Sequence, residues 1–143
     1  AKAKERTVEE KTILIIRDAE LAALHKRPAK GLLAGMYEFP SMKGYHTAEE
    51  VRKYLAENGL QVLRIQPLED AKHIFSHREW HMKGYLIRVD ELAPKREGPD
   101  SAEWIYIEPQ ETREKYPIPS AFAAYAKGLD MKLGVRDEDG SGQ

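Results

Sequence analysis

The chain has 143 residues and a formal net charge of −1, and 33% of its residues are charged. This length is enough for one domain with a hydrophobic core of its own, and the near-neutral charge means that any affinity for nucleic acid must come from a local basic patch. The absence of cysteine excludes a disulfide framework, a cysteine-ligated zinc site and an iron–sulfur cluster within this chain, and no apolar run is long enough to span a membrane.

The first part of the sequence predicts strands and an ordered loop. Residues 12–17 form a continuous β-branched run, which predicts a strand buried on both faces. A turn at residues 18–20 leads into a second strand over residues 21–26, so the pair is expected to form a hairpin. Residues 27–40 combine glycine and proline with many apolar side chains, which indicates a packed loop that ends in a short strand at residues 37–39.

One helix is expected to begin after Thr47. Thr47 and Glu50 are spaced as a capping box, in which each side chain accepts a hydrogen bond from the backbone N–H of the other residue. Val51 and Leu55 follow at helical spacing on one face. Gly59 stands where a residue in the left-handed conformation commonly ends a helix.

The second part of the sequence predicts more strands, with short helices between them. Residues 61–65 form a strand, residues 90–100 form a loop, and residues 102–107 form a further strand. Pro109 can begin a short helix that runs to Lys115. A last helix is expected to be capped by Ser120 and to bury an apolar stripe composed of Phe122, Tyr125, Ala126 and Leu129.

A central hairpin carries the most distinctive polar groups. Its first strand is expected at residues 73–75, its corner at Ser76 and His77, and its second strand extends to Val89. Between residues 72 and 88 there are four basic side chains and one acidic one, and such a local excess of positive charge is typical of a surface that binds an anion. The same segment contains three histidines, His73, His77 and His81.

These elements predict an α+β fold, a mixed β-sheet with helices packed on its faces. We expect one domain over residues 11–130, preceded by a charged linker over residues 1–10. Residues 131–143 are acidic and rich in glycine and serine, and they are expected to be disordered.

Three motifs in this order resemble the C-terminal domain of the adenine DNA glycosylase MutY. The first is Arg27-Pro28 followed by the segment GLLAGMYEFP at residues 31–40. The second is Phe75-Ser76-His77 with Trp80 and Tyr85 downstream, and the third is IPSAF at residues 118–122 followed by Lys127. Together the three motifs cover about residues 11–129.

The resemblance implies a Nudix-like fold, as in the nucleotide hydrolase MutT, and a role in recognising 8-oxoguanine opposite adenine. In that family a separate N-terminal domain with an iron–sulfur cluster excises the base. We therefore expect a non-catalytic, monomeric recognition domain without a cofactor of its own. Its expected partners are double-stranded DNA that contains the lesion and the catalytic domain of the same protein, in the bacterial cytoplasm at the nucleoid.

A hydrolase of this fold requires the helix pattern Arg-Glu-U-x-Glu-Glu-x-Gly-U, where U is apolar and the glutamates bind magnesium. Alignment on Gly59 places Arg52 at the arginine of the motif, and the three glutamate positions fall on Lys53, Ala56 and Glu57. Two of the three carboxylates are therefore missing. Because magnesium prefers hard oxygen ligands, the helix is expected to act as a scaffold and not as a metal site.

The chemistry of the lesion suggests how the corner could recognise it. Guanine N7 is an acceptor. In 8-oxoguanine N7 carries a hydrogen, and C8 carries a new acceptor oxygen. A serine hydroxyl both donates and accepts, so Ser76 is the candidate recognition residue, with the Ser76 and His77 amides as further donors. Phe75 is expected to anchor the loop, and Lys72, Arg78 and Lys83 are candidate phosphate contacts.

Other functions remain open at this stage. The chain could be a free-standing Nudix hydrolase of 8-oxo-dGTP, in spite of the missing glutamates. His73, His77 and His81 could gather around a metal, although the strand pattern separates them. The loop at residues 90–100 and the N-terminal segment could instead bind repair or replication proteins. Ser76 itself could simply stabilise a turn.

Overall fold

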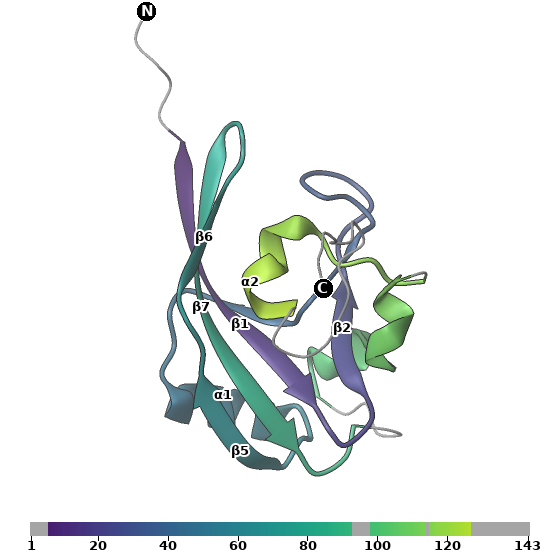
Figure 1. Cartoon of the computed structure of the whole chain (residues 1–143). Coiled ribbons are helices and arrows are strands. Elements are labelled where there is room, and N and C mark those ends of the chain that lie inside the picture. The colour runs from purple at the N-terminus through teal and green to yellow at the C-terminus, as the bar shows by residue number, and fades with distance from the viewer. Residues whose placement is uncertain (1–5, 93–97, 114, 127–143) are drawn as a thin grey trace, which may run out of the picture.

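A single mixed sheet dominates the computed structural model, which describes residues 6–92, 98–113 and 115–126 (Figure 1). Within these residues the sheet has eight strands, and hydrogen-bonded neighbours follow the order β3-β2-β1-β7-β5, while β4 pairs with β1, β6 with β7 and β8 with β2. The pair β1–β7 is parallel and the other pairs are antiparallel. The strands are β1 (Thr7–Arg17), β2 (Ala22–Lys26), β3 (Tyr37–Glu38), β4 (Ser41–Lys43), β5 (Val62–Pro67), β6 (Ala71–Ile74), β7 (Arg78–Val89) and β8 (Trp104–Ile107).

Helical elements pack on both faces of this sheet, as the sequence predicts for an α+β fold. The α-helices are α1 (Ala48–Glu57) and α2 (Ala123–Ala126), and the 3₁₀ helices are η1 (Ser101–Glu103), η2 (Pro109–Arg113) and η3 (Ser120–Phe122). Two core clusters result. One joins η3 and α2 to one face of β1 and β7, and the other joins α1 to the opposite face. None of these helices is long and apolar enough to cross a membrane.

Strand β1 is the centre of the core, as its β-branched run predicts. Ile13 and Ile15 belong to the cluster under η3 and α2, whereas Leu14 and Ile16 belong to the cluster under α1, and all four are fully buried. Alternate residues of a strand point to opposite faces, so a strand that is covered on both sides needs an unbroken apolar run.

Helix α1 begins and ends where the sequence predicts. The Thr47 hydroxyl accepts a hydrogen bond from the Glu50 N–H (3.2 Å), and Glu50 Oε1 accepts one from the Thr47 N–H (2.9 Å). Gly59 has a φ of 82°, the left-handed conformation that was expected just after the helix. Val51 and Leu55 are fully buried against the sheet.

Four details differ from the expectations. Strand β1 begins at Thr7, because its parallel pairing with β7 extends down to Arg78, so residues 7–10 belong to the sheet and not to a linker. Strand β4 was not predicted. The segment after Pro109 is a 3₁₀ helix. Ser120 does not cap the last helical segment, because Pro119 occupies the cap position and no side chain caps it. Leu129 and the expected tail at residues 131–143 lie outside the described residues.

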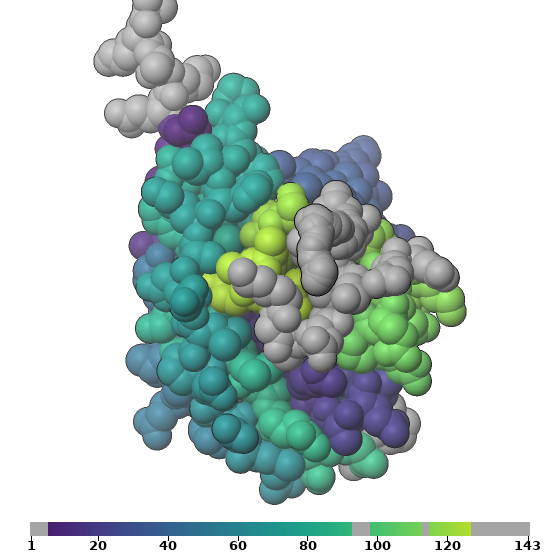
Figure 2. Space-filling view, in the orientation of Figure 1, coloured from purple at the N-terminus to yellow at the C-terminus, as the bar shows by residue number. Residues whose placement is uncertain are grey.

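The hairpin β6–β7 extends away from the rest of the sheet. Strand β5 pairs with residues 85–89 of β7, and β6 pairs with residues 79–82 of the same strand. Beyond the end of β5, the strands β6, β7 and the start of β1 therefore form a narrow arm. Figure 1 shows this arm above α1, and in Figure 2 its teal tip stands out from the body.

Candidate functional site

The corner of the β6–β7 hairpin lies at the tip of this arm. The Phe75 N–H donates to the Arg78 carbonyl (2.8 Å), which leaves Ser76 and His77 as the two residues of the turn. The Thr7 N–H donates to the His77 carbonyl (3.0 Å), and Arg6 Nε donates to the Phe75 carbonyl (3.2 Å). The start of β1 thus fixes the backbone of the corner on one side.

Ser76 and His77 are both exposed at this corner. Within the described part of the chain, the Ser76 hydroxyl and the His77 ring make no hydrogen bond to protein groups. A hydroxyl in this position is available to donate to and accept from a ligand. The hairpin and its exposed corner therefore have the geometry that the sequence predicts.

Phe75 anchors the corner from the inner face of the hairpin. Its ring lies edge-on to Trp80, with the centroids 4.9 Å apart, and the centroid of the His73 ring lies 4.7 Å from it. Trp80 is fully buried and packs against Phe122, with centroids 5.6 Å apart. Phe75 itself is half-buried, so a row of aromatic rings connects the corner to the core.

The three basic candidates do not share one face of the arm. The register pairs Lys72 with His81 and His73 with Trp80, so Lys72 and Lys83 lie on the face opposite Trp80, while Arg78 lies on the same face as Trp80. Lys72 is exposed. Arg78 forms an ion pair with Glu9 (3.1 Å).

The register also separates the histidines. His73 and His81 project from opposite faces of the hairpin, and His77 is at its corner. His81 Nε2 donates a hydrogen bond to Glu79 Oε1 (3.0 Å). Within the described residues, no three His, Cys, Asp or Glu side chains gather in a geometry that could bind a metal.

A groove of about 360 Å³ brings the three sequence motifs together. Leu33 and Met36 come from the loop of the first motif, His73 and Phe75 from the hairpin, and the last wall is formed by residues 117–121. In Figure 2 the teal hairpin, the blue loop and the yellow-green C-terminal segment border the same hollow. The groove is mainly apolar and lies directly under the corner that carries Ser76.

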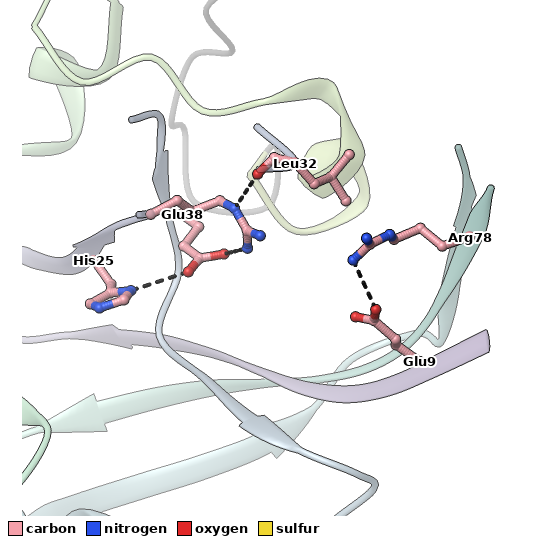
Figure 3. Close-up of polar contacts among 6 residues, drawn as sticks. Glu9, His25, Leu32, Glu38 and Arg78 are labelled. Carbon is pink, nitrogen blue, oxygen red and sulfur yellow. Dashed lines mark hydrogen bonds and ion pairs between the residues drawn. The ribbon is translucent and has the colours of Figure 1, made fainter. Parts of the chain in front are cut away.

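An ion-pair network that the sequence did not predict lies on the other side of the first motif (Figure 3). Glu38 is buried and bonds to Arg27 (2.9 Å) and to His25 (3.1 Å), and Arg27 Nε also donates to the Leu32 carbonyl (3.0 Å). Burial raises the pKa of Glu38, but the hydrogen bonds from His25 and Arg27 outweigh it and lower that pKa. The hydrogen bond to Glu38 raises the pKa of His25.

This network fixes the loop of residues 27–36 to the sheet. His25 and Glu38 are direct partners in the antiparallel pair β2–β3, and Arg27 follows at the end of β2. The only sequence signal for it is the presence of an acid and a base at the two ends of an apolar, glycine-rich loop.

Comparison with known proteins identifies the fold family. A family model described as a NUDIX domain matches residues 12–128. The chain belongs to the NUDIX domain family.

The relatives of this NUDIX domain include a DNA glycosylase. The adenine DNA glycosylase of Mus musculus is 34% identical over 91 residues, which are 59% of this chain and 18% of the glycosylase. The chain thus corresponds to less than one fifth of that protein. The sequence identity over this part confirms the resemblance drawn from the three motifs.

Solved structures show the same fold. The C-terminal domain of mouse MUTYH, solved in complex with human PCNA, superposes with a TM-score of 0.60 at 23% identity, over 92% of this chain and 95% of that domain. A MutT NUDIX hydrolase from Burkholderia pseudomallei superposes with a TM-score of 0.57 at 16% identity, over 87% of this chain and 99% of the hydrolase. At these identities the likeness concerns the fold, and it confirms the predicted Nudix-like sheet.

The helix of this NUDIX domain that aligns with the hydrolase motif is α1. Its four motif positions, Arg52, Lys53, Ala56 and Glu57, are all exposed. Glu57 is the only carboxylate among them, and within the described residues it belongs to no group of three potential metal ligands.

A small hollow of about 200 Å³ lies beside α1 and contains other acidic groups. It is lined by Glu38, Asp100 and Glu103, together with Tyr54 from α1. The Tyr54 hydroxyl donates to Asp100 (2.6 Å), and burial together with this bond raises the pKa of Tyr54. Glu38 is bound by Arg27 and His25, and Glu103 Oε1 lies 3.7 Å from His25 Nε2, so all three carboxylates have partners within the protein.

Proposed function

We propose that this NUDIX domain recognises 8-oxoguanine opposite adenine in double-stranded DNA, as a non-catalytic part of an adenine DNA glycosylase. The observation that carries the proposal is the exposed Ser76 hydroxyl at the tip of the arm, on a corner whose backbone is fixed by Arg6 and Thr7. A hydroxyl can accept from the N7–H of 8-oxoguanine and donate to its C8 oxygen, and normal guanine lacks both groups.

The surroundings of the corner support this role. Phe75 packs edge-on against buried Trp80, and this contact restricts the corner, so we infer that little conformational freedom is lost on binding. The exposed Lys72 provides a positive charge close to the corner for the DNA backbone, and His77 is placed to contact the sugar or phosphate.

The proposal assigns the excision chemistry to another part of the protein. The mouse glycosylase is much longer than this chain, and we propose that a separate catalytic domain with an iron–sulfur cluster provides the activity and joins this domain on the lesion. The domain described here contributes affinity for the lesion and its own chemistry is limited to hydrogen bonding.

The test compares Ser76→Ala with the unchanged chain on two duplexes, one with 8-oxoguanine opposite adenine and one with guanine opposite adenine. Loss of one neutral hydrogen bond is worth about 0.5–1.5 kcal/mol, so the preference for the oxidised duplex should fall by up to about tenfold. Fluorescence anisotropy at fixed salt measures both affinities.

His77→Gln serves as the matched control at the same corner. It keeps a hydrogen-bonding side chain and removes the ring, so it should change both affinities equally. If Ser76→Ala also weakens binding to both duplexes by the same factor, Ser76 contributes to general DNA affinity or to folding, and lesion recognition by its hydroxyl is wrong.

A further inference from the structure

Two lysines face each other across strands β1 and β4. The antiparallel register places Lys11 directly opposite Lys43. Directly opposed side chains leave the same face of a sheet with Cβ atoms about 4.5–5.5 Å apart, and like charges in this position destabilise the pair of strands. A bound anion would convert this repulsion into attraction.

The carboxylates near Lys11 are already paired with other cations. Glu9 binds Arg78 (3.1 Å), and Glu38 binds Arg27 (2.9 Å) (Figure 3). Within the described part of the chain neither Lys11 nor Lys43 forms an ion pair with a carboxylate. Neither ammonium group therefore has a carboxylate in direct contact, although the negative charge of Glu38 acts on Lys11 from a greater distance.

The Lys11 ammonium has a restricted position. Its Nζ lies 4.0 Å from the centroid of the Trp80 ring, and Trp80 is fully buried. Burial lowers the pKa of Lys11, and the negative charge of Glu38 opposes that effect. The cation–π contact fixes the ammonium group before any ligand arrives, so its ordering costs little on binding.

A hollow of about 900 Å³ adjoins both lysines, where the chain leaves β4. It is lined by residues 8–11 of β1 and residues 41–44 of β4 and the turn after it. Gly44, with a φ of 83°, turns the chain there. Two hydrogen bonds fix this turn: the Gly44 N–H donates to the Glu10 carbonyl (2.7 Å), and the Gly44 carbonyl accepts from the Thr12 hydroxyl (2.7 Å). Glu10 also lines the hollow, but it alternates with Lys11 along β1 and so projects from the opposite face of the sheet.

We propose that Lys11 and Lys43 form a phosphate-binding site, and that its ligand is a phosphodiester of the DNA strand bound at the Ser76 corner. The identity of the ligand rests on the proposed function, whereas the phosphate chemistry rests on the lysine pair. Thr7 contacts the corner, and the four residue-to-residue steps from Thr7 to Lys11 span about 13 Å, which corresponds to about four base-pair steps of 3.4 Å. The site lies within reach of a duplex centred on the lesion.

The first arm of the test measures duplex binding across a range of salt concentrations for Lys43→Gln and Lys11→Met, with Lys53→Gln on α1 as the matched control. Each true phosphate contact contributes about 0.9 to the slope of log K against log salt, so each variant should lower that slope by about this amount. Both duplexes should weaken by the same factor, and Lys53→Gln should change neither. Lys43 and Lys53 are both exposed, so we expect Lys43→Gln and Lys53→Gln to fold like the unchanged chain.

The second arm follows the backbone amide of Gly44 by NMR during titration with inorganic phosphate and with duplex DNA. We expect both to shift it, and Lys43→Gln to reduce both shifts. A response to phosphate combined with an unchanged salt slope would assign the site to a free phosphate or nucleotide and overturn the DNA assignment. No response to either ligand would overturn the phosphate site itself.

Failure of the proposed function and failure of the phosphate site give different results in these experiments. If the unchanged chain binds both duplexes equally and still loses salt dependence on Lys43→Gln, lesion recognition is wrong and the phosphate site stands. If Ser76→Ala removes the lesion preference while both lysine variants behave like Lys53→Gln, the phosphate site is wrong and lesion recognition stands.

Discussion

Around Ser76 the backbone is fixed at three points, by Thr7, by Arg6 and by the packing of Phe75 on Trp80. A single exposed hydroxyl can discriminate between two bases only if it is presented in one position, because a flexible loop would adapt to both. The residues that orient the corner therefore matter as much as the hydroxyl.

Replacement of Phe75 by alanine tests this orientation. Truncation of a buried phenylalanine costs about 3–5 kcal/mol, and since Phe75 is half-buried we expect about half of that, roughly 2 kcal/mol, in urea denaturation. Lesion preference should fall although Ser76 is intact. Phe75→Leu, which keeps most of the apolar contact, should retain the preference. If Phe75→Ala retained it as well, the aromatic anchor would have no part in recognition.

The His25–Glu38 contact predicts a pH dependence of stability. The hydrogen bond to Glu38 raises the pKa of His25 above its ordinary 6.5 in the folded chain. The stabilisation from protonated His25 is therefore complete below pH 6.5 and is lost as the pH rises through the raised pKa. Urea denaturation across this range should show a decline in the free energy of unfolding that His25→Gln lacks. The same decline in His25→Gln would assign the effect to another group.

Among the individual residues, the sequence predicts the turn at Ser76 and His77 better than it predicts the ion-pair network around Glu38. Ser76 and His77 are consecutive polar residues between two apolar runs, so local pattern alone places them in a turn. Glu38 meets His25 only through the register of β2 with β3, and Arg27 meets it only through the fold of the loop. Contacts that depend on register are not encoded in any short stretch.

Among the elements, α1 is the one that local sequence specifies most completely. Its capping box, buried stripe and C-terminal glycine all lie within residues 47–59 and all appear in the structure. Thr47→Ala should cost about 1 kcal/mol of stability, the usual worth of an N-terminal cap. Chemical denaturation measures the loss, and Glu57→Ala at the other end of the helix serves as the control. Because α1 is expected to be a scaffold, lesion preference should not change; a loss of preference in Thr47→Ala would contradict that role.

Strand β7 contains a glycine that packing requires. A Cβ at Gly84 would clash with the ring of Tyr125, whose hydroxyl donates to the Glu69 carbonyl (3.0 Å). Gly84→Ala should therefore destabilise the chain by about 1–3 kcal/mol, the usual cost of overpacking. A double-mutant cycle with Tyr125→Ala should show strong coupling, because removal of the ring makes room for the methyl group. Additive effects would show that Gly84 is needed for another reason.

Two of the features that the sequence missed depend on distant parts of the chain, and a third has a local cause. The first four residues of β1 form a strand because β7 pairs with them, although their charged side chains alone suggest a linker. Strand β4 has three residues and is defined by its pairing with Lys11, Thr12 and Ile13. Pro119, and not Ser120, holds the cap position because the neighbouring prolines fix where the helical turn can start.

At the scale of the whole molecule, the domain has the sheet of the NUDIX fold and places the exposed Ser76 and His77 on a separate arm. The hydrolase positions of α1 lie on the other face of the sheet from the aromatic row that anchors Ser76. Under the proposed function, a domain of this fold lacks two carboxylates of the hydrolase motif and binds its ligand at a different place.

The missing carboxylates of the hydrolase motif predict that the chain does not hydrolyse nucleotides. Lys53 and Ala56 stand where the motif requires carboxylates, and magnesium has too few hard ligands there. Incubation with 8-oxo-dGTP and magnesium, with product detected by chromatography, should show no turnover above a blank without protein. Magnesium-dependent turnover that is lost in Glu57→Gln would contradict the assignment of α1 as a scaffold.

The most direct test of lesion recognition is chemical-shift mapping of the chain with two matched duplexes, one with 8-oxoguanine opposite adenine and one with guanine opposite adenine. We expect the amides of residues 75–78 to shift differently with the two duplexes, while α1 responds to neither. Identical shifts at residues 75–78 with both duplexes, or a lesion-dependent response centred on another surface, would contradict it.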